Sequence, residues 1–271
     1  MEGAPIATPE PELSAGLHGR ATPEPGLTYR LLRGLWRLAA DALGLHLQLE
    51  GAEHLPRDAT GRPTGGWILA GMPHRTWIDP FVPWILLPAR PRLTFFGDAR
   101  TMARSAARRW VVDRLGGVVP IPASRDPKVV ATHLAAAAQL LDAGAIFMLF
   151  PETGPASEVG HVRRLGGGLG YIALRNRAPI VPVIFGGNHE LYWGRRIVMR
   201  VLPLLDPLDL AGLDPGSALP PEGSSAERAA VHRLTAALAE RVGPAVADVH
   251  ARSEPRSGTR KRGQFLTKMF R

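Results

Sequence analysis

Apolar and polar residues follow two alternating patterns along most of the chain. Short apolar or strictly alternating runs predict strands at 45–51, 67–72, 92–98, 116–125, 145–152, 179–187 and 195–202. Longer stretches with apolar residues three and four apart predict helices at 27–44, 101–115, 126–144, 169–178 and 224–242. Because strands and helices alternate through 45–205, we predict an α/β fold with a mainly parallel central sheet flanked by helices.

The first predicted helix, 27–44, is amphipathic and ends at Gly44. Its leucines fall near one face and its arginines lie off that face: Leu27, Leu31, Leu35, Leu38 and Leu45 against Arg30, Arg33 and Arg37. Two interpretations stay open. The helix either lies on a membrane surface or packs against its own domain.

Composition changes at both ends of this pattern. Residues 1–26 are proline-rich and acidic and predict a disordered leader. Residues 27–250 form one predicted domain, with its motif-bearing core at about 45–210. The basic segment 251–271 has apolar residues interleaved and predicts a flexible tail, which either binds anionic lipid or is simply solvated.

The net charge of +9 suggests an anionic partner or reflects an arginine-rich composition on a solvated surface. The basic residues are spread along the chain and aromatic residues are few, so we do not expect nucleic-acid binding. No apolar run approaches the ~20 residues of a spanning helix, and the N-terminus lacks the apolar core of a signal peptide. We therefore expect a peripheral or monotopic protein on the cytoplasmic side of a membrane, in contact with its anionic surface.

Some chemistries are excluded or disfavoured by residue type. The chain has no cysteine, so it has neither a thiol nucleophile nor thiolate metal ligands. Its nine histidines include no pair at helical spacing, and we expect no metal and no cofactor.

The stretch "GMPHRTWIDP" offers a candidate catalytic pair, His74 and Asp79. Pro80 removes Asp79 from helical geometry, so a loop can bring the imidazole to the carboxylate. Such a pair fixes the tautomer of a histidine general base. Asp79 could instead serve only as a helix N-cap. At the end of a later strand, Glu152 occupies the place where α/β folds display functional groups.

Four stretches together resemble the motifs of the glycerolipid acyltransferases, in order and spacing. They are HxxxxD at 74–79, "GGVVPIPASR" ending at Arg125, "FPETG" at 150–154 and "PIVPV" at 179–183. The likeness covers about 45–210 and is to 1-acyl-glycerol-3-phosphate acyltransferases.

The resemblance implies that His74 takes a proton from an acceptor hydroxyl while Asp79 orients it. The hydroxyl oxygen then attacks the thioester of acyl-CoA or acyl carrier protein directly. The remaining motif residues take their implied roles from the family. Arg125 holds the phosphate of a lysophospholipid, Glu152, Thr153 and Gly154 shape the acceptor site, and Pro182 lies on the acyl-donor side.

One departure from the family bears on the acceptor. The third motif has Pro155 where the family has an arginine. Arg163 or Arg164 could replace that arginine, or the acceptor is a non-phosphorylated lipid such as an aminolipid or glycolipid. A catalytically silent lipid-binding relative is a further alternative. The apolar stretch 77–88 is interpreted partly as core and partly as an acyl-chain entrance or membrane patch.

Overall fold

The computed structural model describes residues 24–76, 78–98, 118–121, 126–153, 160–255 and 261–269. The leader 1–23, the helix expected at 101–115, Trp77, Arg125 and Gly154 lie outside this range.

The described residues form a seven-stranded sheet in the order β1-β7-β6-β2-β5-β3-β4. Its strands are β1 (His46–Glu50), β2 (Trp67–Met72), β3 (Leu93–Asp98), β4 (Val118–Ile121), β5 (Ile146–Leu149), β6 (Ile180–Gly186) and β7 (Arg196–Val201). Neighbouring strands are parallel except β6 and β7, which are antiparallel. The predicted mainly parallel sheet is confirmed, with every predicted strand present.

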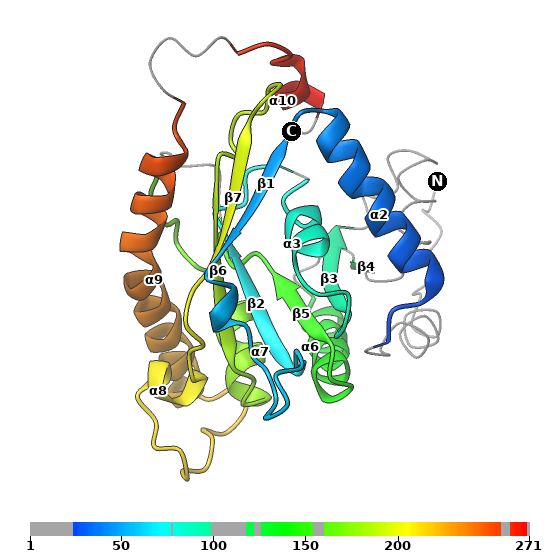
Figure 1. The fold of residues 1–271 in the computed structure, drawn as a ribbon. Coiled ribbons are helices and arrows are strands. Elements are labelled where there is room, and N and C mark those ends of the chain that lie inside the picture. The colour runs from blue at the N-terminus through cyan, green and yellow to red at the C-terminus, as the bar shows by residue number, and fades with distance from the viewer. Residues whose placement is uncertain are drawn as a thin grey trace, which may run out of the picture.

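Helices cover both faces of the sheet. They are α2 (Leu27–Ala42), the short 3-10 helix η1 (Ala52–His54), α3 (Phe81–Leu86), α6 (Pro127–Asp142), α7 (Gly167–Arg175), α8 (Pro207–Ala211), α9 (Ser225–Ser253) and α10 (Phe265–Met269). Figure 1 shows α9 on one side of the sheet and α2 with α3 on the other. Helices α6 to α9 pack on one face and α2 and α3 on the opposite face.

The position of β2 at the centre of the sheet explains why its sequence is apolar throughout. All six residues are buried, because each face of the strand meets a helical layer. Ile68 and Met72 point into the core beneath α7 and α9, while Trp67 and Leu69 point into the core beneath α2 and α3. A parallel strand covered on both sides is therefore apolar throughout rather than alternating.

Helix α2 presents two apolar faces. Tyr29 and Trp36 pack on the domain, with the Trp36 ring stacked on Phe81 at 4.7 Å between centroids. Four leucines of α2, called here the leucine stripe, are 61–73 % exposed: Leu27, Leu31, Leu35 and Leu38. The helix thus lies on its own domain and still offers an apolar face to its surroundings. Leu45, expected on that face, is buried instead.

Two expectations about exposed segments need correction. The apolar stretch after Trp77 is mostly core, because α2 covers it and leaves Phe81 and Trp84 at most 8 % exposed. The domain also extends past residue 250, since α9 continues to Ser253.

Part of the tail is packed rather than flexible. In the segment 261–269, Leu266 is buried, the Lys261 ammonium lies 2.6 Å from a Glu190 carboxylate oxygen, and the Thr267 hydroxyl accepts a hydrogen bond from the Leu191 amide. Leu266 therefore packs on the domain, whereas Phe265 stays 67 % exposed.

Candidate active site

The loop after β2 holds the predicted pair. The strand ends at Met72, a cis Met72–Pro73 peptide follows, and the chain then curls so that Nδ1 of His74 lies 2.9 Å from Oδ2 of Asp79. The Asp79 side chain is fully buried, whereas the His74 side chain is 42 % exposed. An imidazole fixed by a buried carboxylate and open on its other side is the arrangement that a general base needs.

Five donors converge on the Asp79 carboxylate. Besides His74, the amides of Arg75 and Thr76 donate to Oδ2 at 2.6 and 2.7 Å. The Thr76 hydroxyl and the Asn188 amide group donate to Oδ1 at 2.7 and 3.1 Å. These hydrogen bonds fix the position of the buried carboxylate. Helix α3 begins after Pro80 with no side-chain cap, so the interpretation of Asp79 as an N-cap is wrong.

The surroundings of His74 set both its tautomer and its ring plane. Because the amides of Arg75 and Thr76 donate to the same Asp79 oxygen, that oxygen acts as an acceptor, so Nδ1 of His74 carries the proton and Nε2 keeps its lone pair. The ring stacks on Phe150, with centroids 4.1 Å apart and planes 19° from parallel. Gly71 makes room for this stack, since a Cβ there would lie 2.8 Å from a Phe150 ring carbon.

Glu152 lies beside the pair, as its place at a strand end predicted. Its Oε2 accepts a 2.7 Å hydrogen bond from the backbone amide of His74, and its Oε1 accepts from the amide of Arg163 at 3.4 Å. The loop after β2 that holds the candidate pair is called here the catalytic loop. The Glu152 carboxylate therefore joins the catalytic loop to the loop before α7. This contact assigns Glu152 a positioning role in addition to the expected acceptor role, which stays a prediction.

The other predicted site residues lie on the two loops joined by Glu152 and on β6. Thr153 donates through its amide and its hydroxyl to the carbonyl of Arg164, at 3.0 and 3.1 Å, so these loops pair side by side. Arg164 is exposed, and the Arg163 guanidinium donates to the Thr153 carbonyl at 3.2 Å. Pro182 is buried within β6 opposite Ala70 of β2, and its donor-side role stays a prediction.

Asn188 is a site residue that the sequence analysis did not identify. It is 2 % exposed, and its side-chain nitrogen donates to Oδ1 of Asp79 and to the Pro73 carbonyl, both at 3.1 Å. It comes directly after the predicted strand 179–187, much as Glu152 ends the predicted strand 145–152, and that position could have marked it as a site residue. At the next position, burial and then the positive charge of Arg195 lower the pKa of His189.

Sheet order explains how distant residues meet. Strands β6, β2 and β5 are neighbours and parallel, so their carboxyl ends lie at one edge. The three strands deliver Asn188, His74 and Glu152 respectively.

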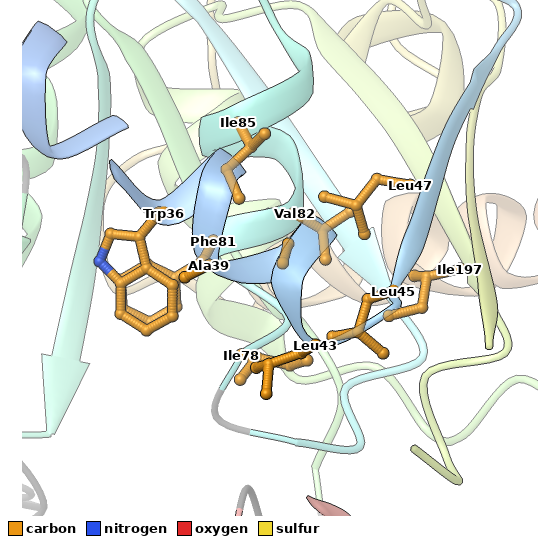
Figure 2. Close-up of a pocket in the computed structure, with 11 residues that line it drawn as sticks. Trp36, Ala39, Leu43, Leu45, Leu47, Ile78, Phe81, Val82, Ile85 and Ile197 are labelled. Atoms are coloured by element: carbon orange, nitrogen blue, oxygen red, sulfur yellow. The ribbon is translucent and has the colours of Figure 1, made fainter. Parts of the chain in front are cut away.

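A small, partly open apolar pocket lies beside this loop (Figure 2). Its walls come from α2, α3, β1 and β7 and from the position before Asp79, and its volume is about 30 Å³. The lining residues are Trp36, Ala39, Ala40, Leu43, Leu45, Leu47, Ile78, Phe81, Val82, Ile85 and Ile197.

Comparison with known proteins assigns the chain to a family. The model of the acyltransferase family matches residues 46–186, more than half of the chain. This chain is a member of the acyltransferase family. No curated protein matches it.

Among solved structures, this acyltransferase is similar to PlsC of Thermotoga maritima, a 1-acyl-sn-glycerophosphate acyltransferase. The TM-score is 0.51 at 19 % identity, over 88 % of this chain and 83 % of that one. The likeness extends the fold assignment beyond the family match. Within the described residues, no helix is both long enough and apolar enough to cross a bilayer.

Proposed function

We propose that this acyltransferase moves a fatty acyl group from acyl-CoA or acyl carrier protein to a hydroxyl of a lysophospholipid, 1-acyl-glycerol-3-phosphate. The observation that carries the proposal is the 2.9 Å contact between exposed His74 and fully buried Asp79. Family membership supplies the reaction class.

The geometry supports a direct transfer. Nε2 of His74 takes the proton of the acceptor hydroxyl as its oxygen attacks the thioester carbonyl carbon. The tetrahedral intermediate then expels the thiolate, which receives the proton from the imidazolium. Asp79 stabilises the positive charge of the imidazolium through its contact with Nδ1. No protein nucleophile is required, in keeping with the absence of cysteine.

The apolar pocket of Figure 2 supports an acyl-chain seat. It abuts the catalytic loop through Ile78, and all its walls are aliphatic or aromatic. Its 30 Å³ is roughly twice what one water needs, so a fatty chain enters only when lining side chains such as Trp36 of α2 and Leu43, which follows α2, move aside.

The leucine stripe supports docking on the cytoplasmic side of an anionic membrane. A helix with exposed leucines beside the exposed Arg30 and Arg37 suits the interface between headgroups and acyl chains. Replacing Leu31, Leu35 and Leu38 by Ser should abolish flotation with anionic vesicles without lowering the thermal midpoint, because these side chains do not pack on the domain. Flotation that survives would refute this part of the proposal.

A non-phosphorylated lipid acceptor is the second candidate. Its motivation is Pro155 in the third motif, together with the hydrogen bond that directs the Arg163 guanidinium to the Thr153 carbonyl. Pro155 has no charge to bind a phosphate, and the Arg163 guanidinium is engaged by Thr153. A phosphate would then have to be held by Arg164 and Arg125.

The deciding experiment measures thiol release from a panel of acyl-CoA and acyl carrier protein donors. Acceptors are lysophosphatidic acid and then uncharged lysolipids. We expect acceptor-dependent release that disappears in His74→Ala and persists in His46→Ala, a matched change of an exposed histidine on β1. The preferred acceptor decides between the two candidates. Release that survives His74→Ala would refute the mechanism, and no release with any pair would favour a silent lipid-binding relative.

A further inference from the structure

Two histidines and a glutamate converge behind the catalytic loop. His189 follows Asn188 on the turn after β6, while His250 and Glu254 stand one helical turn apart near the end of α9. One ring nitrogen of each histidine and a carboxylate oxygen of Glu254 all lie within 4.8 Å of one another. Among the residues that the structure describes, this is the group whose ligand atoms gather so closely.

We propose that His189, His250 and Glu254 form a binding site for a divalent transition metal, with Zn²⁺ as the best fit. Nε2 of His189 and Nδ1 of His250 lie 3.3 and 3.4 Å from Oε1 of Glu254. These separations are at or beyond the upper end of the hydrogen-bond range. They match the edge of a tetrahedron around Zn²⁺, about 3.3 Å for ligand bonds of about 2.0–2.1 Å.

The surroundings limit the choice of ion. The positive charge of Arg195 acts on His189 and opposes any cation, while Glu254 offsets one unit of it. Hard ions such as Mg²⁺ and Ca²⁺ prefer several oxygens and gain little from imidazole. Zn²⁺, Ni²⁺ and Cu²⁺ bind imidazole strongly enough to tolerate the nearby charge.

The geometry around the cluster leaves room for an ion but not for a larger ligand. Both imidazoles line a cavity of about 10 Å³, the size of a single water or ion. Arg75 also lines this cavity and adds a second positive charge, while Glu254 lies outside its lining. Gly160 covers the His250 ring so closely that a Cβ there would lie 2.6 Å from its Cδ2.

A metal here would act as a structural link rather than in the chemistry. It would join α9 to the turn that carries Asn188, whose side chain holds Asp79 and the Pro73 carbonyl. Metal loading would then stabilise the fold and restrict the catalytic loop. The sequence analysis did not detect the site because it sought histidine pairs, whereas the helical pair here is His250 with Glu254 and the third ligand comes from another element.

The test is Zn²⁺ binding by the full chain after treatment with a chelator, measured in competition with a chromophoric chelator. The visible absorption of bound Co²⁺ then reports coordination number. We expect one Zn²⁺ per chain, a tetrahedral Co²⁺ spectrum and a higher thermal midpoint with Zn²⁺. His250→Ala and Glu254→Gln should each raise the apparent Kd more than about tenfold.

The matched control is His232→Ala, which removes an exposed histidine from the same helix and should leave the Kd unchanged. Wild-type binding no tighter than that of Glu254→Gln, or equal losses in His232→Ala, would overturn the proposal. Glu254 is partly exposed, so Glu254→Gln keeps the test valid if His250→Ala fails to fold.

Discussion

Replacing Asn188 by Ala should break the link between the turn after β6 and the catalytic loop. The change removes one hydrogen bond to the charged Asp79 and one to the neutral carbonyl of Pro73. A bond to a charged group contributes about 1.5–3 kcal/mol and a neutral one about 0.5–1.5 kcal/mol. The free energy of unfolding should therefore fall by about 2–4 kcal/mol, and the thermal midpoint by roughly 5–15 °C for a domain of this size.

The same change should reduce turnover. Asp79 keeps its four other donors but loses the contact that fixes it relative to β6, so the His74 ring is less well placed. Misplacement of a reacting group by about 1 Å costs up to about 100-fold. We expect kcat of thiol release to fall about 10–100-fold, with KM for both substrates nearly unchanged, because Asn188 is buried away from them.

The assay pairs steady-state kinetics, well below the thermal midpoint, with calorimetry. Asn176→Ala is the control, since that side chain donates to the Ile172 carbonyl of α7 at 2.8 Å, outside the site. It should lower stability by about 1 kcal/mol and leave kcat unchanged. If Asn188→Ala lowers the thermal midpoint but keeps full kcat, the argument for positioning is refuted.

Three further changes test other contacts of the site and its support. Glu152→Gln removes the carboxylate that accepts from the His74 amide and should lower kcat about tenfold, with KM for the acyl donor unchanged. Gly71→Ala places a Cβ 2.8 Å from the Phe150 ring and should destabilise the fold by about 1–3 kcal/mol in a melting experiment. The hydrogen bond from Lys261 lowers the pKa of Glu190 below its usual value. Their contact should therefore hold residues 261–269 above about pH 4.5 and fail as the pH drops through the lowered pKa, as hydrogen exchange of that segment would report.

Each of these has an outcome against it. A wild-type kcat in Glu152→Gln would show that the carboxylate does not position His74 for turnover. An unchanged melting curve for Gly71→Ala would mean that the Phe150 ring moves away from the added Cβ at no cost in stability. Equal protection of residues 261–269 at about pH 7 and about pH 3 would show that Glu190 does not hold the segment.

Local sequence was sufficient where neighbours along the chain determine the structure. The strand 67–72 could be predicted with its bounds, because a parallel strand covered on both faces must be continuously apolar. The pair of His74 with Asp79 could be predicted too, because Pro80 excludes a continuous helix.

Long-range packing decided the features that sequence left open or missed. Asn188 meets Asp79 across 109 positions, a contact that follows from the order of the strands and from no local pattern. The apolar stretch around Phe81 is buried because Trp36 of α2 stacks on it. Leu266 is buried against the loop after β6, which composition alone could not distinguish from a solvated basic tail.

The interior position of β2 in the sheet has a consequence for local opening of the structure. Strands β6, β2 and β5 each have neighbours on both sides, whereas β1 and β4 form the two edges. Local opening in proteins begins at frayed edges and mobile loops and reaches central strands only near global unfolding. We therefore expect the amides of β2 to exchange among the slowest in the chain. The site is then attached to the most protected part of the sheet, at His74, Glu152 and Asn188. Helix α2 and the edge strands β1 and β4 should open more often than this part.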